Sequence, residues 1–249
     1  MITFSHNDKI YLGRNAGRDI LQEIRKAKHS IKIISPYLTP SYVEELVALN
    51  KKGVDITLIT ADDVEKGDGR YSTLDHTHLV KQLCEKDEEE AEKRSNRMFW
   101  SGIGLATSGV LIVLSFLLSL WLLILGLAGM IVAGIYFFWS KEIVVYTYSY
   151  ETIFKLKICF SQYCRDGVHK GTHLIHSKVF VVDDDVAFVG SVNFTHSGLV
   201  KSYETAVRVT DKKAVKDLSE EVDRLFNTKE GYFKDIQEWG KELYTEPPN

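Results

Sequence analysis

The chain contains no charged residue over 43 consecutive positions, from residue 98 to residue 140. One membrane-spanning helix needs about 20 apolar residues, so this segment is long enough for two. Trp100 stands near one end of the segment, Trp139 near the other, and Trp121 close to the middle. A helical hairpin that turns around Ser119–Trp121 would place Trp100 and Trp139 at one membrane interface and Trp121 at the other, as an aromatic belt requires. The sequence therefore predicts a transmembrane hairpin that joins the protein to a lipid bilayer.

Small residues and flanking charges support this hairpin. Close approach of its two helices is expected at six glycines, which are Gly102, Gly104, Gly109, Gly126, Gly129 and Gly134. Basic residues flank the segment on both sides, namely Lys93, Arg94, Arg97 and Lys141, whereas the expected turn carries no charge. The positive-inside rule then predicts two spans, with both soluble parts in the cytoplasm. Two alternatives remain, a helical hairpin buried in a soluble core and a re-entrant hairpin that enters one leaflet.

The rest of the composition is that of a folded protein. Hydrophobic residues make up 45% and charged residues 26% of the 249 positions, and the formal net charge is −3. This balance gives no overall positive field of the kind that marks many nucleic-acid-binding proteins. Three cysteines cannot form a fully paired disulfide framework, and the first ten residues lack the apolar run of a signal peptide. We therefore expect a protein of a reducing compartment that is not secreted.

Outside the hairpin, the pattern alternates between strands and helices. Strands are expected at Ser30–Ser35 and Val54–Thr60 with a helix near Ser41–Asn50 between them, which is a βαβ unit with a parallel strand pair. Asn15 is expected to cap an earlier helix, and a long polar helix from Ser72 to Arg97 is expected to continue into the first membrane span. Further strands are expected at 143–148, 154–160, 178–182, 186–189 and 203–209, and further helices at 213–226 and 232–244.

Polar groups suited to phosphate chemistry gather between residues 173 and 199. His176 and Lys178 are two residues apart on an extended segment, so their side chains point to the same face. Ser191 and Asn193 have the same spacing after a strand that ends at Gly190. A lysine, an amide and a hydroxyl can hold phosphoryl oxygens, while an imidazole can act as nucleophile or proton donor. This set of residues points to a phosphodiester substrate and not to a metal site.

The spacing His176-x-Lys178-x4-Asp183, followed by Gly190-Ser191-x-Asn193, resembles the HKD signature of the phospholipase D superfamily. Gly198 and Glu204 extend the resemblance downstream, and Ser35-Pro36-Tyr37 with the following GVDITLIT strand extends it upstream. The resemblance covers roughly residues 14–97 and 141–227. It implies an α/β fold, a mixed sheet flanked by helices, which the hairpin interrupts. The expected parts are residues 1–97 and 141–249, which share one phospholipase D-like domain, and the hairpin of residues 98–140.

The resemblance also implies a mechanism. The family's active site uses two HKD motifs and this sequence has one, so a homodimer is expected to complete the site. His176 would attack phosphorus to give a phosphohistidine, and the partner subunit's His176 would protonate the leaving alkoxide and then activate water. Lys178, Ser191 and Asn193 would bind the phosphoryl oxygens. Glu204 would orient the imidazole, and Asp183 would organise the site. No metal or organic cofactor is implied.

Two other groups of residues bear on the chemistry. The residue types of a small zinc site occur in Cys159, Cys164, His169 and His173, although their spacing is longer than that of a common zinc knuckle. A buried cysteine with loop histidines is the alternative interpretation. A basic approach to His176 is expected from Lys155, Lys157, Arg165 and Lys170.

Three functions fit these observations. A membrane-anchored, metal-independent endonuclease is favoured, because compact members of the family with one motif are often endonucleases and a basic approach suits a polyanionic strand. The alternative is a phospholipase D-type hydrolase or transferase that acts on phospholipid headgroups, since the hairpin would hold the site near the bilayer. The third is a non-catalytic membrane scaffold. Because His176, Lys178 and Asn193 are all present, an enzyme is expected.

Overall fold

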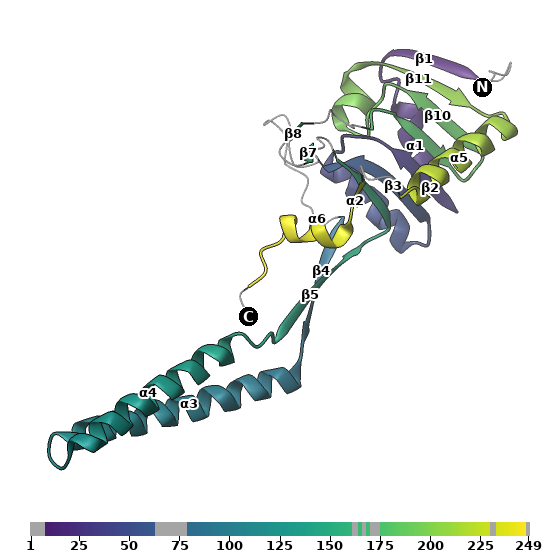
Figure 1. Cartoon of the computed structure of the whole chain (residues 1–249). Helices are drawn as coiled ribbons and strands as arrows, with labels where there is room; N and C mark the ends of the chain where they lie inside the picture. The colour runs from purple at the N-terminus through teal and green to yellow at the C-terminus, as the bar shows by residue number, and fades with distance from the viewer. Residues whose placement is uncertain are drawn as a thin grey trace. The chain divides into compact units, whose positions relative to one another are not determined.

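The computed structural model describes residues 8–62, 79–160, 164–165, 168–169, 175–229 and 233–247. Its contacts divide the chain into two compact units (Figure 1). The first unit comprises Met1–Lys81 and Tyr150–Leu243. The second comprises Gln82–Ser149 together with Tyr244–Asn249.

The first unit is built on an eight-stranded mixed sheet with the order β1-β11-β10-β9-β2-β3-β6-β12. Its strands are β1 (Lys9–Arg14), β2 (Ser30–Ile34), β3 (Asp55–Ala61), β6 (Lys155–Cys159), β9 (Val179–Val182), β10 (Val186–Gly190), β11 (Tyr203–Val209) and β12 (Phe233–Lys234). The pairs β2–β3 and β3–β6 are parallel, and the remaining pairs in this order are antiparallel. The sheet confirms the predicted α/β fold and the predicted parallel pair.

Helices accompany this sheet, and both of its faces are buried at the centre. The helices are α1 (Arg18–Lys26), α2 (Pro40–Lys51), α5 (Lys212–Asn227) and α6 (Ile236–Leu243), with a π-helical turn, η3 (Ser197–Lys201). Val215 and Val222 of α5 belong to one buried cluster with Val181 and Ala187 of the sheet. Phe180, the neighbour of Val181, points to the opposite face and is 1% exposed. Burial on both faces fixes the register of the central strands, because a slip by one residue would move every side chain of the strand to the opposite face of the sheet.

The start of α1 differs from the prediction. Gly17 occupies the N-cap position without a side-chain hydrogen bond, so Asn15 is not the cap. Asn15 instead adopts a φ of 69°, and its carbonyl oxygen accepts a hydrogen bond of 3.0 Å from the Arg18 N–H. Asparagine is one of the few residues that tolerate this left-handed conformation. Asn15 therefore turns the chain from β1 into α1.

The second unit contains the long helices α3 (Glu88–Ser115) and α4 (Leu120–Lys141) and most of a two-stranded sheet, β4 (Val80–Lys86) with β5 (Tyr146–Thr152). The prediction of a polar helix from residue 72 is wrong over β4, which is extended. Residues 72–78 lie outside the described residues. The helix starts only after Asp87, whose carboxylate accepts a hydrogen bond of 3.0 Å from the Glu90 N–H. The strand pairs with a segment some sixty residues later in the chain, and local sequence carries no trace of that pairing.

The helices α3 and α4 pack against each other as a hairpin, and three of the six glycines lie at their contact. A Cβ atom on Gly126 would lie 2.7 Å from Ile112 Cγ1, and one on Gly129 would lie 2.6 Å from Ser108 Oγ. A Cβ on Gly104 would likewise lie 3.0 Å from the Cβ of Ala133. The prediction is wrong for the other three glycines, which face open space: Gly102, Gly109 and Gly134.

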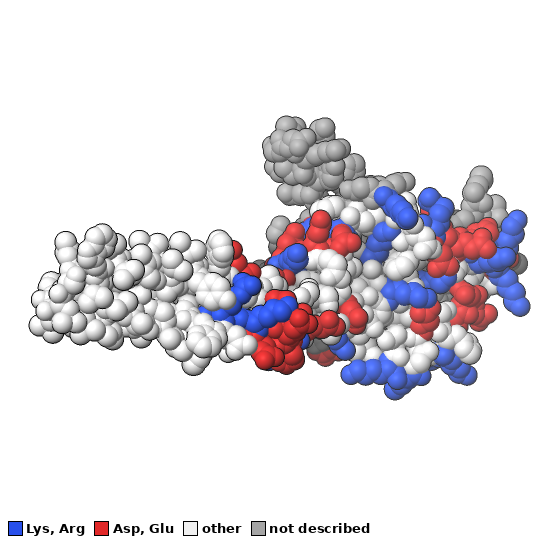
Figure 2. Space-filling view, turned by 60° about the horizontal axis from the view of Figure 1, so that its bottom comes forward, with Lys and Arg blue, Asp and Glu red and all other residues white. Residues whose placement is uncertain are grey.

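Both helices of the hairpin are long and apolar enough to cross a membrane. They turn at residues 116–119, and Ser119 caps α4 by accepting a hydrogen bond from the Trp121 N–H. In Figure 2 the visible face of the hairpin is white, and basic and acidic side chains gather near the ends of the helices away from the turn. The apolar surface is therefore continuous from the turn to this charged zone.

Candidate active site

The predicted motif residues lie at strand ends that meet at one end of the sheet. The start of β9 lies beside the end of β2, because Val179 pairs with Ile34. Since β9, β10 and β11 are successive antiparallel neighbours, the start of β9, the end of β10 and the start of β11 share this end. His176 and Lys178 precede β9, Ser191 follows β10, and Glu204 is the second residue of β11. This is also the carboxyl end of the parallel strands, where open α/β sheets usually bind ligands.

A buried lysine contacts an exposed histidine at this place. Lys178 Nζ lies 3.1 Å from His176 Nδ1 and donates a hydrogen bond of 2.6 Å to the His176 carbonyl oxygen. Lys178 is only 4% exposed, and burial lowers the pKa of its ammonium group although the nearby Glu204 charge opposes the shift. A protonated ammonium can only donate, so His176 Nδ1 accepts and the imidazole hydrogen is on Nε2 in this arrangement.

Ser191 joins Glu204 to the neighbouring strand. Its hydroxyl donates a hydrogen bond to the Glu204 carboxylate and accepts one of 3.0 Å from the Thr205 N–H. Its own N–H donates to the Thr205 carbonyl oxygen at 2.9 Å. The preceding residue has to be glycine, because a Cβ on Gly190 would lie 2.0 Å from that same carbonyl oxygen. The hydroxyl and the carboxylate are thereby held as a pair at the end of the sheet.

The side-chain oxygen of Asn193 is buried and has no hydrogen-bond partner among the described residues. The backbone around it is fixed, because Gly198 packs so closely that a Cβ there would lie 2.6 Å from the Asn193 carbonyl oxygen. Buried polar groups are nearly always paired, so an orphaned amide next to a candidate site needs a reason. Because this oxygen is an acceptor, it could accept a hydrogen bond from a donor group of a ligand without first losing a bond within the protein.

Asp183 is not brought together with the other predicted residues. It lies at the opposite end of β9, in the turn to β10, and its carboxylate accepts hydrogen bonds from the N–H groups of Lys28, His29 and Ser30. Burial would raise the pKa of Asp183, but these three backbone donors outweigh it and hold the pKa below its ordinary value. The carboxylate therefore ties the β9–β10 turn to the start of β2.

The expected basic approach to His176 is wrong for two of its lysines. Lys155 lies at the start of β6, which is the far end of the sheet because β6 runs parallel to β3, and it forms a 2.7 Å ion pair with Asp55. Lys157 Nζ instead donates to the carbonyl oxygens of Phe226 and Thr228 at the end of α5. Arg165 is described only as backbone, and Lys170 lies outside the described residues.

The zinc hypothesis finds no support among the described side chains, where no cluster of three candidate ligands occurs. Cys159 is buried at the end of β6, and this burial raises the pKa of its thiol. Cys164 and His169 face each other in the short ladder of β7 (Cys164–Arg165) and β8 (Val168–His169), of which only the backbone is described. His173 lies outside the described residues, so the zinc site stays a prediction.

A buried hydroxyl that residue spacing alone does not reveal positions the loop of Asn193. Ser35 Oγ accepts a hydrogen bond of 2.9 Å from the Phe194 N–H and donates one of 2.8 Å to the Tyr37 carbonyl oxygen. Close by, the His196 N–H donates to Thr39 Oγ1 at 2.9 Å. These contacts join segments more than 150 residues apart in the chain. Only the resemblance at Ser35-Pro36-Tyr37 pointed to this loop.

A mixed α/β sheet with these groups at one end defines a phospholipase D-like protein. The sequence profile of the family described as "Cardiolipin synthase, PLD-like domain" matches residues 20–101 and 139–226, well over half of the chain. The protein belongs to this family. The phospholipase D superfamily consists of phosphodiesterases, among them nucleases and enzymes that modify phospholipids. The predicted family relationship is confirmed.

Three solved structures align with the chain at low similarity. NucT from Helicobacter pylori aligns with a TM-score of 0.45 and 12% identity over 88% of this chain and 94% of its own. Nuc from Salmonella typhimurium, a phospholipase D family member, aligns with a TM-score of 0.44 and 17% identity over 93% and 99% of the two chains. Phosphatidylserine synthase from Haemophilus influenzae Rd KW20 gives 0.44 and 10% over 96% of this chain and 41% of its own. No curated protein matches the sequence significantly.

Proposed function

We propose that the protein is a membrane-anchored phosphodiesterase that uses His176 as its nucleophile and needs no metal ion. The observation that carries this proposal is the contact between the buried Lys178 ammonium and the exposed His176 imidazole, 3.1 Å apart at the ligand-binding end of the sheet. The Lys178 cation and the N–H groups of the Asn193 side chain are suited to donate to phosphoryl oxygens while the imidazole attacks. The hairpin of residues 98–140 would anchor residues 1–97 and 141–249 on the cytoplasmic side.

In this mechanism, His176 Nε2 attacks phosphorus, an N–P bond forms and the bond to the leaving alkoxide breaks. The attack needs a lone pair on Nε2, so the imidazole hydrogen must be on Nδ1. In the arrangement described above, Lys178 donates to Nδ1 and favours the opposite tautomer. A bound phosphate would draw Lys178 away from Nδ1, and the imidazole hydrogen would move from Nε2 to Nδ1. Glu204 would then accept a hydrogen bond from Nδ1–H and hold this tautomer. Water finally attacks the phosphohistidine and restores the enzyme.

A second proton-transfer group is needed for the leaving alkoxide. The sequence has one His-x-Lys-x4-Asp motif, so we propose a homodimer in which the partner subunit's His176 protonates the alkoxide and later activates water. Co-expression of wild type with rising amounts of His176→Ala should then lower the activity as the square of the wild-type fraction, because a mixed dimer lacks one of the two imidazoles. Without a shared site, the activity would fall in simple proportion to the wild-type fraction.

Nucleic acid is the first candidate substrate, and phospholipid is the second. His176 and Ser191 are both exposed at the strand ends, and such an accessible site suits a long polymer. The position of Lys155 and Lys157 removes part of the electrostatic argument for a polyanion. Two apolar helices in the same chain favour phospholipid headgroups, because they would keep the site at a lipid surface.

The test uses the full chain in detergent with EDTA, comparing wild type with His176→Ala. His29→Ala is the matched control, because His29 is an exposed histidine at the opposite end of the sheet. Substrates are labelled single- and double-stranded DNA and RNA, vesicles of phosphatidylglycerol, and bis(p-nitrophenyl) phosphate. Removing the nucleophile should lower kcat by about 10³-fold or more, and the control should keep wild-type activity. Equal activity of wild type and His176→Ala on every substrate would contradict the proposal.

A further inference from the structure

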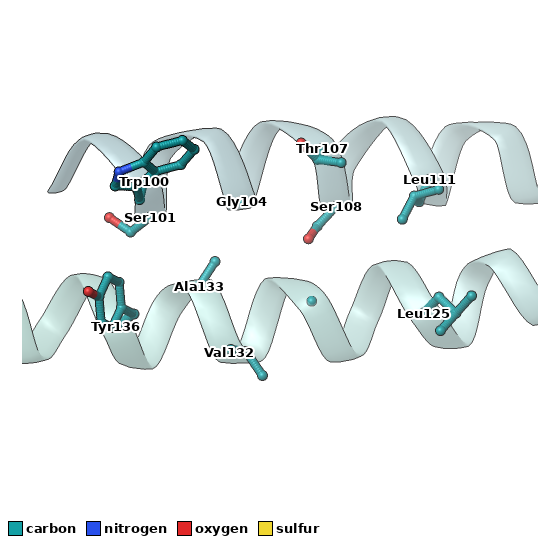
Figure 3. Close-up of a pocket in the computed structure, with 11 residues that line it drawn as sticks. Trp100, Ser101, Gly104, Thr107, Ser108, Leu111, Leu125, Val132, Ala133 and Tyr136 are labelled. Carbon is teal, nitrogen blue, oxygen red and sulfur yellow. The ribbon is translucent and has the colours of Figure 1, made fainter. Parts of the chain in front are cut away.

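A groove runs along the hairpin between α3 and α4, with a volume of about 450 Å³ (Figure 3). It lies within the second unit and is bounded at one end by Trp100 and Tyr136 and at the other by Leu111 and Leu125. Small residues line its floor, where Gly104 and Gly129 bring the two helices into contact. The groove is therefore a feature of the hairpin surface itself.

The lining is mostly apolar, and two of its hydroxyl groups donate hydrogen bonds to the backbone of their own helix. Ser101 Oγ and Thr107 Oγ1 donate hydrogen bonds of 2.8 Å to carbonyl oxygens of their own helix, those of Met98 and Ile103. Ser108 is only 4% exposed and points from α3 toward α4 across the groove (Figure 3). Its hydroxyl has no hydrogen-bond partner within the described residues. The groove thus offers an apolar path with one unpartnered hydroxyl along it.

A cation and two aromatic rings stand at one end of the groove. The Arg97 guanidinium lies 5.9 Å from the centre of the Tyr136 ring. Arg97 also precedes Trp100 by three residues, which is about one turn of α3. Arg97 forms no ion pair with an acidic residue of the described chain. Tryptophan and tyrosine are typical of the headgroup level of membranes, and a guanidinium binds phosphate with two parallel hydrogen bonds. This end is suited to a phosphate group, whereas the rest of the groove is suited to hydrocarbon.

The length of the groove matches one leaflet. From Trp100 to Leu111, α3 rises by about 16 Å at 1.5 Å per residue. Half of the hydrocarbon core of a bilayer is about 15 Å thick. We propose that the groove binds one acyl chain of an anionic phospholipid whose phosphate lies at Arg97. This inference rests on the membrane anchoring proposed above and is independent of the phosphodiesterase chemistry.

The test places the full-length protein in nanodiscs of phosphatidylcholine containing phosphatidylglycerol with a photoactivatable acyl chain. Cross-linked residues are identified by mass spectrometry. Arg97→Gln removes the cation that lies over the ring of the groove residue Tyr136. Lys141→Gln is the matched control, because the Lys141 ammonium lies over the Phe137 ring, which does not line the groove. Thr107→Trp fills the groove from its exposed rim, and Val110→Trp adds the same bulk at an exposed position outside it.

Cross-links of phosphatidylglycerol should concentrate on groove residues and fall about fivefold in Arg97→Gln, the change expected for one cation at a lipid surface. Thr107→Trp should abolish them, and both controls should keep them. Cross-links spread evenly over all exposed faces of the hairpin would overturn the proposal, as would equal losses in Arg97→Gln and Lys141→Gln. Cross-links on the outer faces of the hairpin with none on the groove residues would show that lipid does not occupy the groove and would also overturn it. Failure of the protein to enter nanodiscs would instead refute the anchoring.

Discussion

Replacing Asp183 by asparagine should destabilise the first unit and leave the chemistry intact. Asparagine has the same shape and tolerates the φ of 54° at this position. The carboxylate accepts hydrogen bonds of 2.9, 2.7 and 2.9 Å from the N–H groups of Lys28, His29 and Ser30. A carboxamide has one acceptor oxygen and no charge, so it loses at least one of these bonds and weakens the others.

The size of the effect follows from these bonds. A hydrogen bond to a charged group contributes about 1.5–3 kcal/mol, and partial exposure of the turn reduces this value. We expect a loss of about 2 kcal/mol in the free energy of unfolding, which lowers Tm by about 6 °C for a unit of this size. Asp185→Asn is the matched control, because Asp185 is an exposed carboxylate of the same turn.

The assay combines thermal unfolding with phosphodiesterase activity at 20 °C, where both variants stay folded. The expected result is a lower Tm for Asp183→Asn and a kcat within about twofold of wild type, since Asp183 lies at the end of β9 opposite to His176 and Lys178. An unchanged Tm together with a kcat reduced about 100-fold would refute the reasoning. Asp183 would then act in the chemistry.

Three further outcomes follow from the structure. Backbone donors hold the pKa of Asp183 below its ordinary 3.8. The difference in unfolding free energy between wild type and Asp183→Asn should therefore be full at neutral pH and should disappear as the pH falls below about 4. Urea unfolding at several pH values measures this difference. Gly190→Ala should cost about 2 kcal/mol or more in unfolding free energy, since the new Cβ would lie 2.0 Å from a backbone oxygen; unchanged stability would show that the strands can separate there at no cost. Gly126→Ala should lower the stability of the hairpin in micelles, as followed by tryptophan fluorescence during denaturation. Gly134→Ala should leave this stability unchanged, because its Cβ would meet open space. Equal effects of the two variants would contradict the helix packing described above.

The elements with strong local patterns could be predicted from sequence. Val54–Thr60 and Tyr203–Val209 were expected as strands and lie within a residue or so of β3 and β11. Buried β-branched and aromatic residues in short runs identify such strands directly. The apolar hairpin was equally clear, because its length exceeds that of ordinary core segments.

Elements that depend on distant partners were missed or misassigned. The sequence pattern does not predict β1, and it predicts a helix over β4 because the polar residues of this strand continue into the acidic start of α3. Each is stabilised by one neighbouring strand far away in sequence, β11 for β1 and β5 for β4. Strand preference of this kind comes from the tertiary environment and is weakly encoded locally.

The same distinction holds for the site. The spacing of His176 and Lys178 predicted that they share a face, and the structure places Lys178 Nζ 3.1 Å from the imidazole. The position of Lys155 could not be predicted, because it depends on β6 running parallel to β3. The direction of a strand within a sheet decides which end its residues reach, and the direction is a property of the whole topology.

The hairpin leaves and rejoins the sheet unit at one point. The Ile153 N–H donates a hydrogen bond of 3.1 Å to the Leu79 carbonyl oxygen, so the chain segments before and after the inserted part are adjacent. A short turn could join them directly, with the intervening residues deleted and the strands of the sheet left in place. The sheet unit and the apolar hairpin would then be separable modules, and a form without the hairpin could be made by a single excision. The same geometry would let evolution add or remove the hairpin in one genetic event without changing the strand order of the sheet.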